Sequence, residues 1–269
     1  MIRIGPAGTS GLGNYEGVRR CKELNLQCME VEFTYGVRMP IPEAKVVGEL
    51  SKKLGIQLSV HAPYWINLNS DEKIKIRQSQ KRIMDSCERG HYLGAEYIVF
   101  HAGFYGKKSP AETYEIIKKS IIEMNEIIDK NKWNVKLAPE TTGKKSQFGD
   151  LDELLRLRRE AKCELCVDFS HIQARDQKID YDEVFGKLAP VKHVHSHFSG
   201  VEYGEKGERR HILTPTSEIK TLLKHVKKYK KDITIINESP DPFGDCMKTL
   251  EILKEKITMV EVMQLESKK

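Results

Sequence analysis

Short apolar or alternating stretches, each bounded by turn residues, recur along the chain and predict eight β-strands. They cover Ile2–Ile4, Cys28–Phe33, Gln57–His61, Tyr97–His101, Val135–Glu140, Glu164–Asp168, His193–His197 and Ile233–Glu238. Between the strands, apolar residues recur at the spacing of one helix face, most clearly over residues 72–90, which end at Gly90, and over 109–130. Predicted strands and predicted helices therefore alternate.

Start signals locate three of the helices more closely. Ser109 and Glu112 form a predicted capping box, and Asp150 and Glu153 form another. A further helix is predicted to begin after Pro215.

Eight β–α alternations in 269 residues predict an α/β fold of the (β/α)8 TIM-barrel type. A doubly wound open sheet is the alternative. The glycine-rich stretch GPAGTSGLG after the first strand lacks the spacing of a dinucleotide-binding loop and is interpreted as an ordinary loop. No linker or change of composition divides the chain, so we expect a single domain over residues 1–269.

Composition narrows the class of protein. Hydrophobic residues make up 39% and charged residues 31%, which is typical of a globular protein, and no apolar run is long enough to predict a membrane span. The net charge of +6 permits a nucleic-acid partner without requiring one. The opening residues lack the pattern of a signal peptide, so we expect a cytoplasmic protein whose six scattered cysteines, including the pair in CELC (163–166), are buried thiols.

One predicted strand carries an unusual set of side chains. In KHVHSHFSG (192–200), three of the nine histidines of the chain fall on alternate positions, so the imidazoles of His193, His195 and His197 share one face. Chance enrichment on a solvated strand and a metal site both explain this pattern, and the strand alone leaves the choice open.

The ends of the strands favour the metal site. Six consecutive predicted strands end with imidazoles or carboxylates: His61, His101, Glu140, Asp168 followed by His171, His195 or His197, and Glu238. In a TIM barrel these ends meet at one mouth, where so many buried polar groups are costly unless metal ions compensate. Mixed nitrogen and oxygen ligands favour zinc, with manganese or iron as possible substitutes. The number of ligands predicts two or three ions, an arrangement used to hydrolyse phosphate esters.

The motifs VHAPYWINL, VFHAG, PETTG, VDFSHI and NESP, in this order and spacing, resemble the endonuclease IV family of abasic-site endonucleases. The resemblance extends over essentially the whole chain. It implies a zinc-dependent TIM barrel that cuts the DNA backbone 5′ to an abasic deoxyribose and leaves a 3′-hydroxyl.

The resemblance also implies roles for individual residues. His61 and His101 match two ligands of one zinc, and Glu140 matches the carboxylate that bridges two zincs. The attacking water is held near Glu140, which is therefore the expected catalytic residue. The other ligands of the second zinc are matched by Asp168, His195 and Glu238, and one ligand of the third zinc is matched by His171. His193 is expected deeper in the barrel, and His197 is expected to line the site behind the ligands.

Two further residues match positions that contact DNA in the family. Tyr64 matches a tyrosine that lies against the DNA, and Arg38 matches an arginine-bearing DNA loop. The implied partner is damaged double-stranded DNA, whose extrahelical abasic nucleotide is cheap to unstack because its base is missing. We expect the protein to act as a monomer.

The sequence departs from the family at two places. The third zinc of the family is completed by Asp-X-His after strand seven, whereas this chain offers Glu208 and His211 in the segment YGEKGERRH, predicted to be a flexible loop. Strand two carries Glu30 and Glu32 where better-known members have apolar residues. Glu32 either reaches the site or forms an ion pair beneath the mouth, and both interpretations stay open.

Two alternatives to a DNA-repair phosphodiesterase follow. A sugar isomerase or epimerase of the xylose-isomerase-like barrels also places Glu, Asp, His and Glu around a metal ion. Glu32 and the altered third site favour it, and the retained His61, His101 and His171 count against it. The other alternative is a DNA- or metal-binding barrel that has lost one ion and with it turnover.

Overall fold

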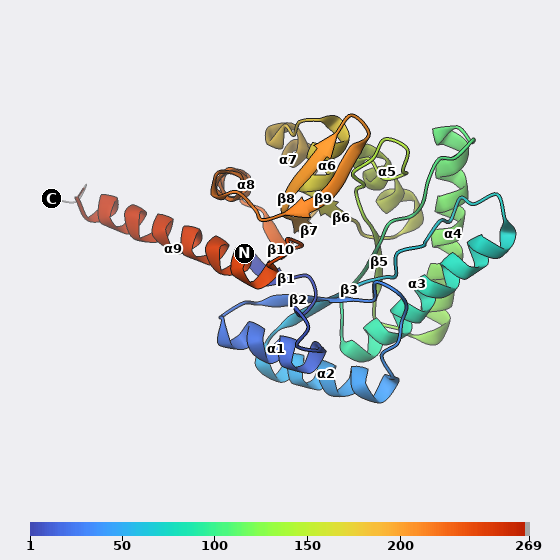
Figure 1. Ribbon diagram of the computed structural model, residues 1–269, viewed down its shortest axis with the longest axis horizontal. Helices are drawn as coiled ribbons and strands as arrows, with labels where there is room; N and C mark the ends of the chain where they lie inside the picture. Colours follow the sequence, from blue (N-terminus) through green and yellow to red (C-terminus); the bar gives the residue numbers. More distant parts are fainter. Residues whose placement is uncertain (267–269) are drawn as a thin grey trace.

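The computed structural model describes the backbone of residues 1–266 and the side chains of residues 1–254 (Figure 1). The strands are β1 (Ile2–Pro6), β2 (Cys28–Glu32), β3 (Gln57–His61), β4 (Tyr97–Phe100), β5 (Lys136–Pro139), β6 (Cys166–Asp168), β7 (His193–Phe198), β8 (Gly200–Gly204), β9 (Gly207–Ile212) and β10 (Asp232–Asn237). The helices are α1 (Asn14–Glu23), α2 (Ile41–Leu54), α3 (Lys73–Leu93), α4 (Pro110–Asn131), α5 (Leu151–Ala161), α6 (Phe169–Asp176), α7 (Tyr181–Lys187), α8 (Thr216–Lys228) and α9 (Pro242–Glu266).

Eight parallel strands form a closed ring made of two four-stranded sheets. One sheet has the order β1-β10-β7-β6 and the other the order β2-β3-β4-β5. Two isolated parallel bridges, Ala7 with Glu30 and Glu140 with Cys166, join the sheets at their edges. The helices lie outside this ring (Figure 1), and the predicted TIM barrel is confirmed. The prediction of one domain includes residues 267–269, which lie outside the described residues, and it stays a prediction.

The eight predicted strands correspond to β1–β7 and β10. The segment expected to be a flexible loop is instead an antiparallel hairpin of β8 and β9, with a bulge between Glu202 and Tyr203. Gly207 turns this hairpin with a φ of 96°, a conformation that side chains other than glycine rarely adopt. The hairpin follows the mouth end of β7 and so lies beside the strand ends.

Both predicted capping boxes are confirmed, because Ser109 with Glu112 and Asp150 with Glu153 exchange the expected hydrogen bonds. The helix predicted to end at Gly90 continues to Leu93 as α3. Gly90 serves packing instead, since a Cβ at that position would lie 2.4 Å from Ile98 Cδ1 on β4. A glycine can therefore mark a close helix–strand approach as well as a helix end.

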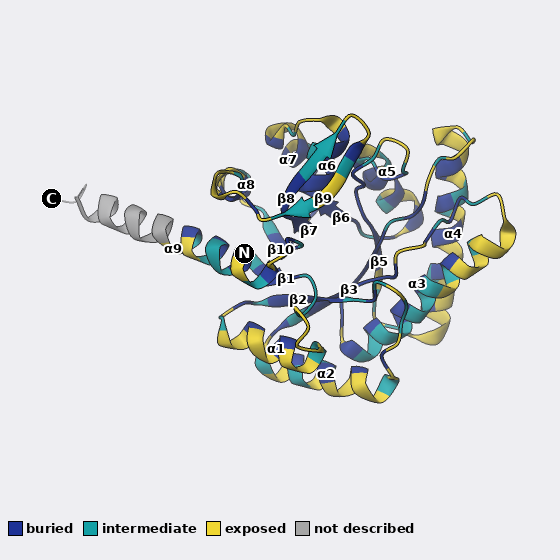
Figure 2. Ribbon diagram, viewed as in Figure 1, coloured by how far each residue is buried: buried dark blue, intermediate teal, exposed yellow. Residues whose placement is uncertain are grey.

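Two cores with different chemistry result from this arrangement. The larger core is apolar and lies between the outward side chains of the strands and the helices, which expose their other faces to solvent (Figure 2). Inside the ring, a small apolar cluster of Tyr97, Val99, Ala138 and Cys166 is accompanied by buried polar side chains, Glu30 among them. The barrel interior beneath the mouth is therefore polar.

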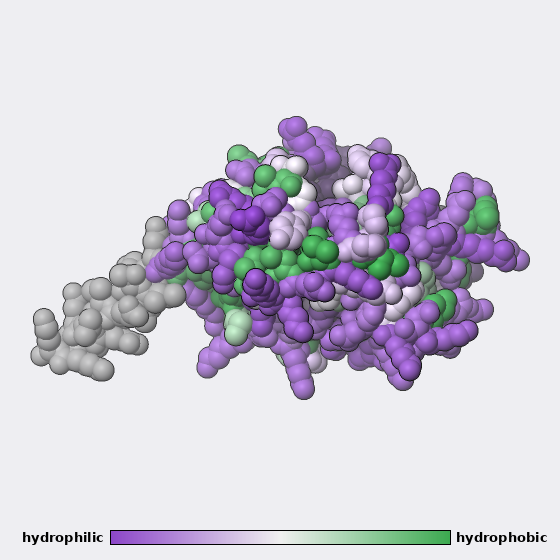
Figure 3. All heavy atoms as spheres, turned by 90° about the horizontal axis from the view of Figure 1, so that it is seen from below, coloured by the Kyte–Doolittle hydropathy of each residue, from purple (hydrophilic) through white to green (hydrophobic). Residues whose placement is uncertain are grey.

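The surface agrees with the composition. Hydrophilic side chains dominate the face seen from below, and hydrophobic ones gather near its middle (Figure 3). Within the described residues, no helix has the length and apolarity to cross a bilayer. All six cysteines are buried and free, as predicted.

Candidate metal centre

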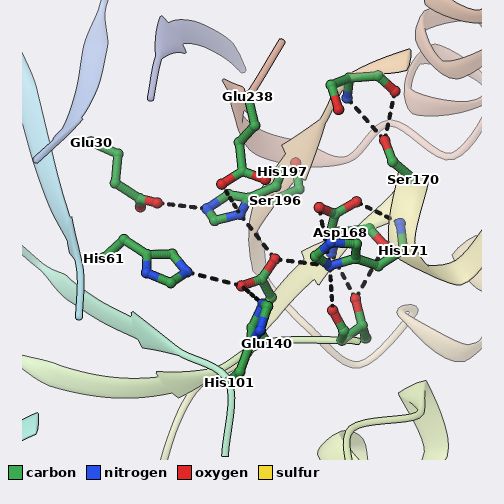
Figure 4. Close-up of polar contacts among 12 residues, drawn as sticks. Glu30, His61, His101, Glu140, Asp168, Ser170, His171, Ser196, His197 and Glu238 are labelled. Carbon is green, nitrogen blue, oxygen red and sulfur yellow. Dashed lines mark hydrogen bonds and ion pairs between the residues drawn. The ribbon is translucent and has the colours of Figure 1, made fainter. Parts of the chain in front are cut away.

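The mouth of the barrel gathers side chains from six strands. His61 and Asp168 are the last residues of β3 and β6, His197 lies near the end of β7, and three more residues directly follow strands: His101 after β4, Glu140 after β5 and Glu238 after β10. Parallel strands in a closed ring place their carboxyl ends together, so these side chains converge (Figure 4). The predicted convergence of the strand ends is present, except that β7 brings His197 to the mouth in place of His195.

Glu140 lies at the middle of the cluster and is 1% exposed. Its Oε2 is 2.9 Å from His101 Nε2 and 3.2 Å from His61 Nε2. Its Oε1 is 3.1 Å from His197 Nδ1 and 3.2 Å from His171 Nδ1. The two oxygens of one carboxylate thus face different pairs of imidazoles, which is the geometry that a bridging ligand requires.

Three groups of ligand atoms surround this carboxylate, and in each of them the atoms lie within 4.8 Å of one another. The first group is His61, His101 and Glu140; the second is Glu140, Asp168, His197 and Glu238; the third is Asp168, His171 and His211. Glu140 is common to the first two groups and Asp168 to the last two. The groups are therefore contiguous.

The structure differs from the prediction at His195, which does not reach the mouth. Its Nε2 lies 3.0 Å from Glu30 Oε2, and its ring stacks on Tyr97 with centroids 4.9 Å apart. His197 occupies the position at the mouth that was expected for His195. Residues two apart on a strand share a face but differ in depth by about 6–7 Å, so His195 lies one layer below His197.

The remaining histidine of the triplet, His193, lies another layer down, as predicted. Its Nδ1 is 3.2 Å from Asp232 Oδ2, and it shares a hydrogen bond with Thr234. Only one of the three aligned imidazoles is therefore close to the ligand groups at the mouth.

The hairpin brings Glu208 and His211 to the cluster, as the sequence suggested. Glu208 Oε2 lies 3.2 Å from His171 Nε2, and Glu208 Oε1 lies 3.6 Å from His211 Nε2. The amide of Glu208 donates to the carbonyl of Gly143. A Cβ on Gly143 would lie 2.7 Å from Glu208 Cβ, so the glycine of the PETTG motif makes room for this longer carboxylate.

The charges of the cluster depend on one another. Burial alone would raise the pKa of Glu140, but His101 and His197 hold it well below its usual range. Burial would also raise the pKa of Glu208, yet contact with His171 lowers it to about 2. Conversely, burial lowers the pKa of His61, and contact with Glu140 raises it to about 10. Protonated imidazoles thus act as the cations for these carboxylates, and bound metal ions would replace their protons.

The donor set fits transition-metal ions. Imidazole nitrogens and carboxylate oxygens are the ligands of zinc, and three or four of them converge in each group. Asp168 Oδ2 is fully buried and has no hydrogen-bond partner among the described residues, so a ligand position is available there.

A cavity of about 380 Å³ opens above the groups. Glu32 lines it together with Tyr64, which settles the position of Glu32 that the sequence left open. Burial raises the pKa of Glu32 to about 8, and His61 opposes this effect. Arg38 does not line this cavity but an adjoining hollow that it shares with Glu32 and Tyr35.

Sequence reasoning did not single out an exposed aromatic cluster beside this cavity. The Tyr35 ring lies 5.8 Å from that of Trp65 and 6.3 Å from that of Tyr64, centroid to centroid. Trp65 directly follows Tyr64 in the motif VHAPYWINL, so the motif contained a signal for it. Tyr35 lies on another loop, and only the fold brings it close.

A family model described as xylose isomerase-like TIM barrel matches residues 18–257. The protein MJ0133 of Methanocaldococcus jannaschii is 39% identical over 256 residues, which cover 89% of this chain and 92% of that protein. A probable endonuclease 4 of Mycoplasma mobile is 29% identical over 195 residues, which cover 67% of this chain and 68% of that protein.

Solved structures with different activities resemble the barrel to a similar degree. SacUVDE has a TM-score of 0.76 at 14% identity, covering 95% of this chain and 99% of that chain. A D-tagatose 3-epimerase-like protein has 0.74 at 19% identity, covering 97% and 99%. Endonuclease IV from Thermus thermophilus has 0.68 at 20% identity, covering 94% and 99%. These likenesses show the fold alone.

Proposed function

The chain belongs to the xylose isomerase-like TIM barrel family, and within this family we propose that it is a zinc-dependent phosphodiesterase that incises DNA 5′ to abasic sites. The observation that carries the proposal is the presence of three contiguous ligand groups around Glu140. A sugar isomerase or epimerase needs only the second group. The imidazoles of the first and third groups count against such an enzyme, whereas a phosphodiesterase uses several ions on one phosphate.

Each group has a distinct part in the proposal. His61 and His101 would hold one ion, Asp168, His197 and Glu238 a second, and His171, Glu208 and His211 a third, with Glu140 between the first two. Bound ions would supply Lewis acidity toward the phosphate and activate the attacking water. Glu140 would fix the spacing between two ions, and this gives it its catalytic role. His195, which contacts Glu30 instead, is left out of the proposed ligands.

The surroundings of the cavity support a DNA partner. Tyr64 is 52% exposed at the edge of the cavity, with Tyr35 and Trp65 beside it, and exposed aromatic rings stack on bases. The cavity is large enough for a sugar-phosphate unit that has left the helix. Arg38, in the adjoining hollow, is in a position to meet a neighbouring phosphate.

One observation favours the isomerase or epimerase as a second candidate. Glu32 is a carboxyl in the same cavity, and burial raises its pKa to about 8. A group with such a pKa exchanges protons near neutral pH, which proton transfer on a small sugar requires. A phosphodiesterase has no evident need for this carboxyl.

The deciding experiment uses a duplex with one abasic analogue, incubated with the protein before and after dialysis against a chelator. The proposal expects a single break 5′ to the analogue on a denaturing gel, lost on chelation and restored by zinc or manganese. An intact duplex at every metal concentration, together with conversion of a ketose to its epimer, would establish the second candidate instead. The proposal includes a cytoplasmic location. It also includes a monomeric state, which size-exclusion chromatography with light scattering would test.

A further inference from the structure

The two ring nitrogens of His197 face opposite directions. Nδ1 faces the mouth, 3.1 Å from Glu140 Oε1 and 3.3 Å from Glu238 Oε1. Nε2 faces the barrel interior, 2.7 Å from Glu30 Oε1 (Figure 4). The imidazole is fully buried, so its contacts with these carboxylates determine which nitrogen carries the proton.

Glu30 reaches His197 from across the barrel. It lies on β2, which is separated from β7 in the ring by β1 and β10. Its other oxygen accepts a hydrogen bond of 2.6 Å from Ser59 Oγ on β3 and lies 3.0 Å from His195 Nε2. The carboxylate is 0% exposed, and Ser59 on β3 and His195 on β7 hold it in position.

We infer that Glu30 is a positioning residue for the second ligand group. Glu30 Oε1 lies in ion-pair contact with His197 Nε2, outside hydrogen-bond geometry. It would draw the proton of the ring to that nitrogen and leave Nδ1 unprotonated toward the ion that Glu140, Asp168 and Glu238 would share. A carboxylate behind a ligating histidine orients the ring in this way and makes it a stronger ligand. The inference rests on the proposed metal centre and not on the reaction proposed for it.

The inference also assigns a function to the histidine alternation of β7. His197 would bind the ion, and His195 would hold Glu30 in place from one layer below. His193 takes no part, because it contacts Asp232 and Thr234 instead. Apolar side chains would fill this space at lower cost than a buried carboxylate, so packing alone does not account for Glu30.

The test is a zinc titration of the full-length protein against a chromophoric chelator, comparing wild type with Glu30→Gln. Glutamine has nearly the same shape but no charge, so one ion should bind roughly 10–100-fold more weakly while the others keep their affinity. His195→Gln should weaken the same ion by a smaller factor. His193→Gln, the same substitution on the same strand, is the matched control and should bind all ions like wild type.

Cobalt supplies a second measurement that a merely structural role of Glu30 would not change. The visible absorption of the cobalt-loaded protein should shift in Glu30→Gln, because the strength of one imidazole ligand changes, and should stay unchanged in His193→Gln. If Glu30→Gln does not fold, Ser59→Ala and His195→Gln disturb the same carboxylate more mildly and should weaken the same ion.

Unchanged zinc affinities and an unchanged cobalt spectrum in these variants would overturn the inference. Equal weakening in His193→Gln would overturn it as well, and so would a His197→Ala variant that binds as many ions as wild type. None of these measurements involves DNA. A protein that behaves as expected here but leaves abasic duplexes intact would refute the proposed phosphodiesterase and keep the role of Glu30.

Discussion

At the scale of single residues, Glu140 is the side chain on which most of the proposed centre depends, because its two oxygens face different pairs of imidazoles. We expect Glu140→Gln to weaken two ions together and to lower incision by roughly 100-fold or more, since loss of a direct ligand costs at least as much as loss of a residue behind one. Elemental analysis after dialysis and the incision gel measure the two effects. Glu16→Gln, at an exposed position, is the control and should change neither.

The third ligand group takes Glu208 and His211 from the hairpin of β8 and β9, not from the ends of the barrel strands. These two residues replace the Asp-X-His of the family with a longer carboxylate and a different spacing, so we expect them to hold an ion less tightly. We therefore predict an exchangeable third ion, so His211→Ala should release one ion and lower incision strongly while the other two stay bound. His225→Ala, which removes a histidine from the outer helix α8, is the matched control. Wild-type incision by His211→Ala at limiting zinc would show that two ions suffice.

Which side chains gather at the mouth of the barrel was largely predictable, and the exception has a simple cause. Imidazoles and carboxylates at consecutive strand ends identify the mouth, because parallel strands bring these ends together. Alternation along a strand gives the face of a side chain but not its depth, and for this reason the sequence favoured His195 where the structure has His197. The contact of Glu30 with His197 joins two strands across the barrel, so the sequence pattern of neither strand predicts it.

At the scale of elements, the capping boxes give a measurable share of helix stability. Ser109 accepts from the amide of Glu112 and begins α4. We expect Ser109→Ala to lower the free energy of unfolding by about 1 kcal/mol in a urea titration, because an amide of the first turn loses its partner. Ser217→Ala is the control, since the start of α8 has no side-chain cap, and its effect should be clearly smaller. Equal effects of the two substitutions would mean that the capping box of α4 adds no stability beyond that of an ordinary serine-to-alanine change.

A carboxylate in the first turn of α9 should make stability depend on pH. Asp245 accepts from the amide of Thr214 and pairs with Lys248. Burial alone would raise its pKa, but these partners lower it below the ordinary value of 3.8. The ionised form is therefore favoured by folding, and its contribution is present above that value and is lost as the pH falls through the lower folded value.

We accordingly expect Asp245→Asn to lower the free energy of unfolding at pH 7 by about 1.5–3 kcal/mol, the range for hydrogen bonds to a charged group. The difference from wild type should shrink as the pH falls below about 4. Urea titrations at several pH values measure it, and Asp129→Asn, at an exposed position, is the control. A difference that stays constant down to pH 3 would contradict the role of the charge.

The elements that sequence reasoning missed share one property. β9 carries charged residues on both faces, and β8 has only three residues between two glycines, so neither a sustained alternation nor an apolar run marks the hairpin. Their pairing depends on Gly207 and on the contact of Glu208 with the loop after β5. Strands and helices that pack against the apolar core were predictable because burial imposes a period on their sequences.

At the scale of the whole molecule, the proposed ions would join ligands from both sheets of the barrel. Because unfolding separates these ligands, ions bind the folded chain and stabilise it by about 2.7 kcal/mol when their concentration is 100 times the dissociation constant. We therefore expect chelation to lower the melting temperature by roughly 5–10 °C in calorimetry, and zinc to restore it. The melting temperature of Glu140→Gln should fall less on chelation than that of wild type. An equal fall in both proteins would show that the ions bind at another site.

The two seams where the sheets meet connect opening of the barrel to the proposed metal centre. Each seam contains an isolated bridge and a few other backbone hydrogen bonds, and each bridge includes a glutamate of the centre or its support: Glu30 with Ala7, and Glu140 with Cys166. We expect the barrel to open first at these seams, because the pairing there is interrupted, whereas neighbours within each sheet form parallel ladders. Opening a seam would pull Glu140 away from the ligands on β6 and β7. Bound ions would then oppose the opening of the seams. The backbone amides at the seams should therefore exchange their hydrogens with the solvent more slowly when the ions are bound than after chelation.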